Sequence, residues 1–229
     1  MQNSNSLKQQ AAEAAVQHIT TNMKIGLGTG STVAYAIHFL AKKVKEEALN
    51  LSFYSTSFST RLLCSKLGLQ VEDLGTTDSL DFAVDGADEI DPNRNCIKGR
   101  GAAHTLEKLV ASMAKEFVVV ADDSKKVPSL GQSFPVPIEV LADAYSYIIG
   151  QTLAMGATKA DVRMCTGGKD GPVISDSGHF IIDAYFKSIQ NPVELQNKLD
   201  SLSGVVEHGL FCNIVNKVIL ATPKGLEVF

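Results

Sequence analysis

An acidic stretch at residues 85–91 contains the side chains of this sequence that are best suited to chemistry. It reads Asp-Gly-Ala-Asp-Glu-Ile-Asp and follows Asp81–Val84, a short segment typical of a buried strand. A lysine in a glycine-rich turn, Lys98–Gly101, comes shortly after it. Open α/β sheets bind ligands at the carboxyl ends of their strands, so acids and a base at such an edge indicate proton transfer on a polar, anionic small molecule. The pattern favours an enzyme.

The acidic stretch also allows two other interpretations. Its four carboxylates belong to Asp85, Asp88, Glu89 and Asp91. They could form a solvated loop in which Asp91 and Pro92 start a turn. They could also bind magnesium, because hard cations prefer oxygen ligands, although Lys98 could neutralise the same charge without a metal.

A second glycine-rich loop, Gly26–Thr32, joins a predicted strand to a predicted helix. Glycines let backbone N–H groups approach an anion, and the start of a helix adds a favourable dipole. The loop has no Walker lysine, and it does not match the spacing of the dinucleotide fingerprint. A hydroxyl-rich loop, Ser55–Thr60, follows the next predicted strand. Together the two loops favour a sugar phosphate; the alternative is a tight turn in which Ser31 only caps the helix.

Glu107 lies early in a predicted helix, Ala102–Lys115, with His104 and Lys108 at helical spacing. A carboxylate there is a candidate base, and the alternative is a surface glutamate paired with a lysine. His104 is more typical of a supporting residue. Lys125 follows another predicted strand, where it could meet a phosphate or point into solvent.

The order of elements predicts the fold class. Strand and helix alternate through the first 125 residues, which predicts a doubly wound, mainly parallel, Rossmann-like α/β sheet. After residues 128–131 the pattern becomes strand, helix, two or three strands, helix and strand, which predicts a smaller inserted α+β domain of ferredoxin-like type. We assign residues 1–128 and 207–229 to the Rossmann-like domain and 129–206 to the smaller one.

Composition excludes several classes of protein. The 229 residues are 45% hydrophobic and 20% charged, and the net charge of −4 argues against a nucleic-acid surface. The polar start, Met1–Ser6, does not resemble a signal peptide, and no apolar run is long enough to cross a bilayer. The four cysteines, at positions 64, 96, 165 and 212, lack C-x-x-C spacing. We therefore expect reduced thiols, no metal site and a cytoplasmic location.

These motifs together resemble the type A ribose-5-phosphate isomerases. The matching segments, in order, are Gly26–Thr32, Val84–Ile90, Ile97–Ala103, Glu107–Lys108, Ala121–Lys125, Phe134–Val140 and Gly204–Phe211. The resemblance covers nearly the whole chain. It implies an aldose–ketose isomerase of the pentose phosphate pathway that interconverts D-ribose 5-phosphate and D-ribulose 5-phosphate through an enediolate. It further implies no metal or organic cofactor, and a homodimer or homotetramer.

The resemblance also implies roles for single residues. Glu107 falls on the family's proton acceptor. The substrate-binding loops of the family match Thr29, Gly30, Ser31 and Thr32; Asp85, Gly86, Ala87 and Asp88; and Lys98, Gly99, Arg100 and Gly101. Lys125 and Lys8 match further substrate-contacting lysines. We expect Asp85 to assist ring opening, Asp88 to position hydroxyl groups and shuttle their protons, and Lys98 to stabilise the enediolate.

Two residues depart from the family's usual pattern. Arg100 stands at the middle glycine of the third loop, where a positive φ would strain it, and Phe58 stands where a polar residue is common. Two other functions stay open: a sugar-phosphate sensor that binds without turnover, and an enzyme similar to CoA transferases that uses a covalent glutamate.

Overall fold

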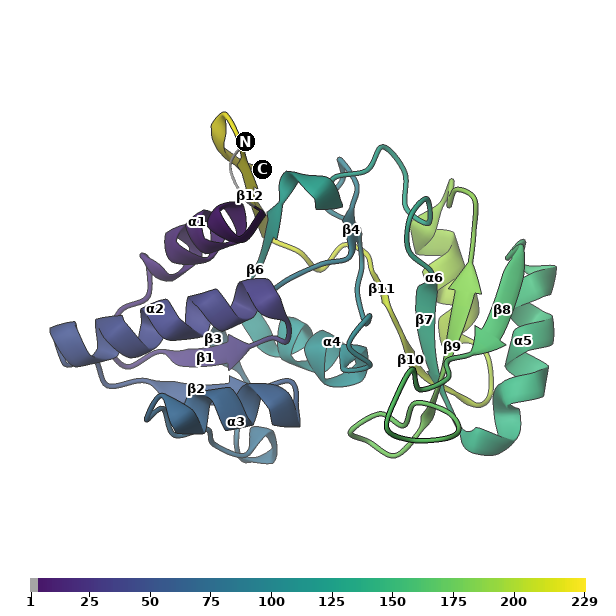
Figure 1. Ribbon diagram of the computed structural model, residues 1–229, viewed down its shortest axis with the longest axis horizontal. Helices are drawn as coiled ribbons and strands as arrows, with labels where there is room; N and C mark the ends of the chain where they lie inside the picture. The colour runs from purple at the N-terminus through teal and green to yellow at the C-terminus, as the bar shows by residue number, and fades with distance from the viewer. Residues whose placement is uncertain (1–3) are drawn as a thin grey trace. The chain divides into compact units, whose positions relative to one another are not determined.

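The computed structural model describes residues 4–229 and forms two compact units, and most of their helices and strands are labelled in Figure 1. Unit 1 contains the chain up to Ala87 together with Leu106–Lys125 and Ile214–Phe229. Unit 2 contains Asp88–Thr105 and Lys126–Asn213.

These units differ from the predicted domains, 1–128 with 207–229 and 129–206. Residues 88–105, 126–128 and 207–213 belong to unit 2, and short strands within the first and last of these segments pair with one another. Such pairing joins segments that are distant in the chain, and local periodicity does not reveal it. The assignment of independently folding domains stays a prediction.

A six-stranded sheet forms the centre of unit 1, in the order β13-β12-β6-β3-β1-β2. Its strands are β1 (Lys24–Leu27), β2 (Ser52–Ser55), β3 (Leu80–Asp85), β6 (Ala114–Asp122), β12 (Lys217–Thr222) and β13 (Gly225–Val228). All pairs are parallel except β12 with β13. Because β2 and β3 lie on opposite sides of β1, the direction in which successive strands are added to the sheet reverses between β1 and β3. The predicted doubly wound sheet is confirmed, and this reversal is its switch point.

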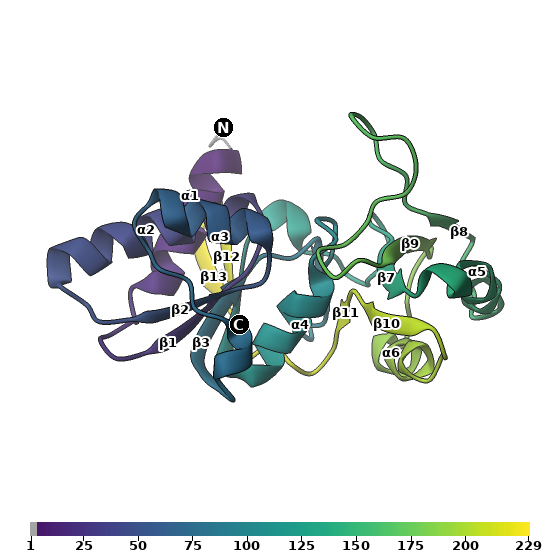
Figure 2. The ribbon, with the colours of Figure 1, turned by 90° about the horizontal axis from the view of Figure 1, so that it is seen from below.

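Helices cover both faces of this sheet. On one face α1 (Ser4–Val16) packs against α2 (Ser31–Glu47), as Figure 2 shows, and both contribute to a core that includes Ile25 and Leu27 of β1. Gly26 points to the other face, since side chains alternate along a strand. A Cβ added to Gly26 would lie 2.4 Å from Val110 Cγ1 of α4 (His104–Met113), so α4 packs closely on that opposite face.

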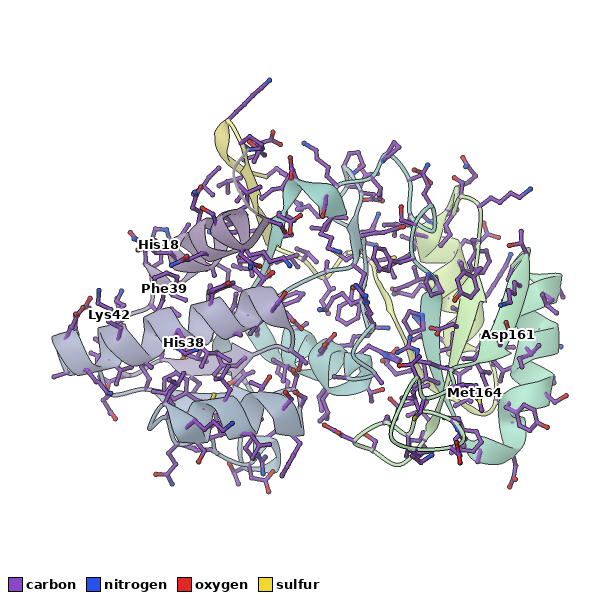
Figure 3. The ribbon with its side chains drawn as sticks, viewed as in Figure 1. His18, His38, Phe39, Lys42, Asp161 and Met164 are labelled. Atoms are coloured by element: carbon purple, nitrogen blue, oxygen red, sulfur yellow. The ribbon has the colours of Figure 1, made fainter. Side chains whose placement is uncertain are left out.

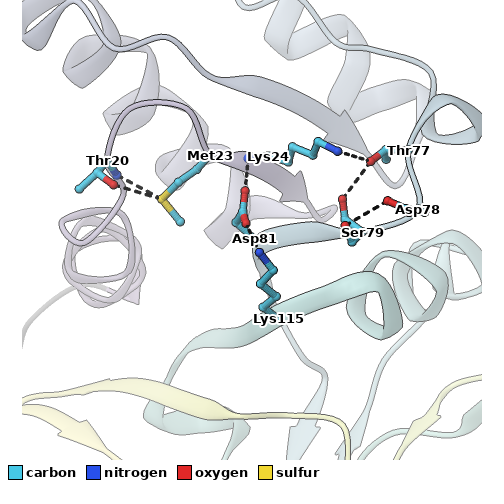
Figure 4. A network of polar contacts seen from close by, with 8 residues as sticks. All are labelled: Thr20, Met23, Lys24, Thr77, Asp78, Ser79, Asp81 and Lys115. Carbon is cyan, nitrogen blue, oxygen red and sulfur yellow. Dashed lines mark hydrogen bonds and ion pairs between the residues drawn. The ribbon is translucent and has the colours of Figure 1, made fainter.

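Polar contacts connect β1, β3 and β6 near their amino-terminal ends (Figure 4). Asp81 accepts the backbone N–H of Lys24 at 2.9 Å and pairs with Lys115 Nζ at 2.8 Å. The hydrogen bond from Lys115 lowers the pKa of Asp81, and the Lys24 amide adds to this. The Lys24 ammonium donates to Thr77 at 2.9 Å. This cluster holds the strands together at the amino-terminal end of the sheet.

Unit 2 contains a four-stranded antiparallel sheet in the order β10-β7-β9-β8. Its elements in chain order are β7 (Val136–Val140), α5 (Tyr145–Ala154), β8 (Lys159–Val162), β9 (Phe180–Tyr185), α6 (Pro192–Asp200) and β10 (Val205–His208). The sequence βαββαβ with strands in the spatial order 4-1-3-2 is that of a ferredoxin-like plait. The predicted fold class is therefore confirmed in both of its parts.

A small three-stranded sheet, in the order β11-β5-β4, completes unit 2. It consists of β4 (Glu89–Ile90), β5 (Cys96–Ile97) and β11 (Leu210–Phe211).

The remaining helical elements of the described residues are a further helix, α3 (Phe58–Lys66), and three short helical turns: η1 (Leu74–Thr76), η2 (Asp123–Lys125) and η3 (Ala142–Ala144). Within residues 4–229, none of the helices combines the length and the apolar character that a bilayer crossing requires.

Candidate active site

Asp85 lies at the switch point of the large sheet, where β1 and β3 end side by side. The N–H of Gly28 donates to the carbonyl of Val84 at 2.9 Å, and the N–H of Thr29 donates to Asp85 Oδ1 at 3.1 Å. The same oxygen accepts the N–H of Gly86 at 2.7 Å, and the side chain is only 2% exposed. The glycine-rich loop therefore closes directly over a buried carboxylate, at the place where sheets of this kind bind ligands.

Gly28 must be glycine for this arrangement to exist. A Cβ at this position would lie 2.0 Å from Asp85 Cγ and 2.1 Å from Oδ1, far inside van der Waals contact. The residue thus allows the loop to approach the acid, which a sequence pattern can indicate only as a generic tight turn.

We expect Gly28→Ala to lower the free energy of unfolding by about 1–3 kcal/mol, the usual range for overpacking a tight site. Urea denaturation measures this loss. Gly150→Ala is the matched control, because a Cβ on that α5 residue meets nothing within 4 Å. Equal stability of the two variants would contradict the tight packing of Gly28 on Asp85.

The hydroxyl-rich loop after β2 joins the glycine-rich loop, as its position in the sequence predicts. Thr29 Oγ1 lies 2.9 Å from Thr56 Oγ1 and donates to Ser57 Oγ at 2.7 Å. Thr60 Oγ1 donates to the carbonyl of Gly28 at 2.7 Å. These hydrogen bonds hold the backbone of the glycine-rich loop from one side. Phe58, at the start of α3, is 63% exposed and leaves this hydroxyl cluster intact.

The start of α2 corrects one alternative interpretation of the sequence. Gly30 occupies the N-cap with φ 119°, and Ser31 is the first helical residue, so Ser31 does not cap the helix. Its hydroxyl instead accepts a hydrogen bond from Lys8 Nζ at 3.3 Å. Thr32, next to it, is 9% exposed. A lysine and a hydroxyl at the start of a helix are suited to an anion.

All four acidic side chains accept backbone N–H groups, and Glu89 and Asp91 each accept two or more of them within unit 2. Glu89, which is fully buried, accepts the N–H groups of Gly131, Ser133 and Phe134 at 2.5–2.9 Å. Asp91 accepts the N–H groups of Asn93 and Asn95 at 2.8 Å each. These carboxylates hold loops of unit 2 in place.

The interpretation of this stretch as a solvated loop is therefore wrong, since Asp85, Glu89 and Asp91 are at most 6% exposed. The turn expected at Asp91 and Pro92 is present, because the Arg94 N–H donates to the Asp91 carbonyl at 3.0 Å. The magnesium interpretation finds no ligand set here either. Between residues 4 and 229, the only three His, Cys, Asp or Glu side chains that converge with metal-ligand spacing are Asp200, Glu207 and His208.

Lys98 and its glycine-rich turn lie in unit 2. Lys98 is 2% exposed, and its ammonium lies 5.3 Å from the centre of the Phe211 ring. Gly99 has φ 100°, and a Cβ there would lie 2.6 Å from Nδ1 of the buried His104. His104 therefore supports this turn by packing, in keeping with the role predicted for it.

Arg100 occupies its glycine position without backbone strain. The residues with positive φ in this turn are Gly99 and Ala102, and Arg100 is not one of them. Its exposed guanidinium lies 5.7 Å from the centre of the Phe134 ring, and its backbone N–H donates to Asp88 Oδ2 at 3.1 Å. The departure from glycine thus changes the surface of the turn and preserves its backbone.

Glu107 is buried, which makes the surface interpretation of this residue wrong. It lies in the first turn of α4 and is 4% exposed. A carboxylate in the first turn is stabilised by the helix dipole. Lys125, the last residue of η2, is half-buried and follows β6 in the same unit.

An ion pair between Arg163 and Asp183 supports the Lys98–Gly101 turn, and no sequence motif marks it. Arg163 and Asp183 lie in unit 2, and Arg163 donates to the carbonyls of Gly99 and Arg100. No local motif marks either residue, because the contact joins segments 63 and 64 positions apart.

A doubly wound sheet with a buried acid beneath a glycine-rich loop at its switch point defines an α/β enzyme. A family model described as ribose 5-phosphate isomerase A (phosphoriboisomerase A) matches residues 52–225. The chain belongs to the ribose-5-phosphate isomerase A family.

Curated relatives and solved structures agree with this over nearly the full length. Ribose-5-phosphate isomerase A of Thermococcus kodakarensis is 44% identical over 222 residues, which cover 96% of each protein. A structure of D-ribose-5-phosphate isomerase in complex with phospho-erythronic acid has a TM-score of 0.96 at 43% identity, covering 100% of this chain and 99% of that one. The enzyme of Methanocaldococcus jannaschii gives 0.93 at 39% identity, with 99% of both chains covered.

Proposed function

We propose that this protein interconverts D-ribose 5-phosphate and D-ribulose 5-phosphate, the reaction for which its family is named. The observation that carries the proposal is the buried Asp85 under the glycine-rich loop, in a chain that belongs to this family. A related structure holds phospho-erythronic acid, a sugar-acid phosphate. We expect the same class of ligand to bind here.

Glu107 acts as the base in this proposal. Its carboxylate removes the proton from C2 of the open-chain aldose, and the electron pair forms a C1–C2 enediolate with negative charge on oxygen. The protonated Glu107 then returns the proton to C1. The O2 hydroxyl gives up its proton as C2 becomes the ketone carbon, and O1 takes up a proton to become a hydroxyl, with Asp88 as the proton shuttle between the two oxygens. Burial of Glu107 supports this role, because a base that is shielded from water keeps the proton for the product.

Lys98 stabilises the enediolate oxygen in the proposed mechanism. A buried ammonium is effective there because little water screens its charge. The N–H groups of Gly99, Arg100 and Gly101 belong to the same turn. Asp85 assists the opening of the sugar ring, and Asp88 positions hydroxyl groups and takes up their protons.

The phosphate of the substrate binds at the start of α2. The bond between Lys8 and Ser31 supports this role, because an ammonium and a hydroxyl already meet there. The loop Thr29–Thr32 supplies further N–H and hydroxyl donors, with Lys125 as an additional contact. Gly86 and Ala87 follow Asp85 along the second binding loop. Binding energy at the phosphate orients the reacting carbons at the other end of the molecule.

A coupled assay tests the proposal directly. Purified protein is mixed with ribose 5-phosphate, and the formation of ketose is followed over time. Saturable binding of ribose 5-phosphate without ketose would indicate a sensor in place of an enzyme. A rate that depends on added CoA would favour transferase chemistry.

We expect dialysis against EDTA to leave the rate of isomerisation unchanged. Glu89 and Asp91 are occupied by backbone donors, and the proposed mechanism uses a lysine to stabilise the enediolate. The measurement compares initial rates before dialysis, after it, and after separate addition of Mg²⁺ or Zn²⁺. A loss that one of these ions restores would contradict a metal-free mechanism.

We further propose a cytoplasmic homodimer or homotetramer. Charged sugar phosphates do not cross bilayers unaided, so their isomerase is expected in the compartment where they are made. Light scattering coupled to gel filtration measures the number of chains, and cell fractionation followed by the activity assay measures the location.

A further inference from the structure

Arg163 follows β8 directly and forms a two-pronged ion pair with Asp183 of β9. Its Nε donates to Asp183 Oδ2 at 2.8 Å, and its Nη2 donates to Oδ1 at 2.5 Å. The side chains are 15% and 14% exposed. A bidentate pair of this kind fixes the orientation of the guanidinium plane as well as its position.

The third nitrogen of the guanidinium reaches the Lys98–Gly101 turn. Nη1 donates to the carbonyl of Gly99 at 3.1 Å and to the carbonyl of Arg100 at 3.0 Å. In a trans peptide the C=O and the following N–H point in opposite directions. The N–H groups of Arg100 and Gly101 are therefore held facing away from Arg163.

One of these N–H groups holds an acid of the proposed site. The Arg100 N–H donates to Asp88 Oδ2 at 3.1 Å. A continuous series of contacts thus runs from Asp183 through Arg163 and the Gly99–Arg100 peptide to Asp88. Hydrogen bonds in such a series polarise one another, so the cation bound to the carbonyl also makes the N–H a better donor.

We propose that Arg163, oriented by Asp183, is a positioning residue for the isomerase reaction. It sets the peptide planes of the Lys98–Gly101 turn, and through them the carboxylate of Asp88. The inference rests on the proposed function, because that function gives the turn and Asp88 their roles. Asp88, Arg100, Arg163 and Asp183 also line one cavity of about 470 Å³ in unit 2.

Arginine is required for this arrangement by its shape. Three of its nitrogens form four hydrogen bonds to an acid on one side and two carbonyls on the other. A lysine has one nitrogen and cannot span both groups. The charge alone is therefore insufficient, and Arg163→Lys is expected to fail in the same way as Arg163→Gln.

The experiment compares Arg163→Gln, Arg163→Lys and Asp183→Asn with a matched control, Lys159→Met. Lys159 lies on β8, the strand that ends just before Arg163, and its Nζ lies 2.7 Å from Oδ2 of Asp161. Figure 3 labels Asp161 and also Met164, the residue after Arg163. Both members of that control pair are more than half exposed, at 65% and 57%. The control removes a cation from the strand without touching the turn.

We expect both Arg163 variants to lower kcat by roughly 10- to 100-fold, the effect of misplacing reacting groups by a fraction of an ångström to an ångström. KM for ribose 5-phosphate should change less, because the phosphate binds elsewhere. The affinity for phospho-erythronic acid, whose carboxylate resembles the enediolate oxygens, should fall with kcat/KM. Asp183→Asn should show a smaller effect in the same direction, and Lys159→Met none.

Thermal denaturation separates positioning from loss of folding. Rates are compared at a temperature where every variant is folded. If Arg163→Gln does not fold, the comparison is made with Asp183→Asn and Arg163→Lys. Wild-type kcat in a folded Arg163 variant would overturn the proposal, as would full rescue by lysine. If Arg163 only stabilised the fold, its replacement would lower Tm without lowering kcat more than it changes KM.

Amide hydrogen exchange gives a readout that is independent of activity. The Arg100 amide should exchange faster in Arg163→Gln than in the wild type and in Lys159→Met. Unchanged exchange would overturn the proposed contact. A wild-type protein that does not isomerise ribose 5-phosphate would instead contradict the proposed function, while the exchange data would still decide whether Arg163 orders the turn.

Discussion

Replacing Glu107 with glutamine is expected to lower kcat for ribose 5-phosphate by roughly 10²–10⁴-fold, the range observed when a general base is lost. The amide keeps the size of the side chain but cannot accept the proton from C2. Glu107 is buried in the first turn of α4. Because the proposed mechanism places the phosphate at other residues, KM should stay close to its wild-type value. Steady-state kinetics measures both constants.

Glu46→Gln is the matched control for Glu107→Gln. Glu46 lies on the exposed side of α2, where it pairs with Lys42 at 3.8 Å. This variant should keep full activity. Transfer of deuterium from C2-labelled ribose 5-phosphate to C1 of the ketose should fall together with kcat in Glu107→Gln and not in the control. A Glu107→Gln enzyme with near wild-type turnover would remove Glu107 from the role of base.

Replacing Lys98 with methionine is expected to lower kcat/KM by roughly 10²–10³-fold, as the loss of one oxyanion donor does in other enzymes. The buried ammonium faces little competition from water, so its charge acts strongly on a developing enediolate. Methionine has a similar length and keeps an apolar contact with the Phe211 ring. The loss should therefore appear in the kinetics far more than in the stability.

Lys187→Met provides the comparison, because Lys187 is an exposed lysine of the same unit. Circular dichroism and thermal denaturation establish that both variants are folded. The role of Lys98 as an enediolate stabiliser is contradicted if its removal changes kcat/KM no more than the removal of Lys187. A rise in KM with kcat unchanged would mean that Lys98 contributes only to binding of the ground-state substrate.

The sequence alone determined the large elements and most of the candidate site. The strand Lys24–Leu27 is apolar and is followed at once by glycines and a helical pattern, so its role at a sheet edge follows from local chemistry. The ferredoxin-like plait likewise follows from the order of strand and helix segments, because each segment shows its own period of hydrophobic residues. The segments that resemble the family cover nearly the same length as the comparisons do.

Only the tertiary structure decided which acid lies under the glycine-rich loop and which one holds a distant loop of unit 2. Asp85 and Glu89 are both carboxylates of the same short stretch. Glu89 nevertheless binds three backbone N–H groups at positions 131–134, and Asp85 lies under the Thr29 loop. The donors lie more than forty positions from Glu89 along the chain. No pattern within a segment encodes such a contact.

The same reason explains the other features that the sequence did not reveal. The strand β11 pairs with β5 from a distant part of the chain, and both strands lie in unit 2. Arg163 follows directly after β8, which ends at Val162, and its side chain reaches the Lys98 turn. Periodicity reports which face of its own element a residue occupies, whereas hydrogen bonds between distant segments exist only once the elements have packed.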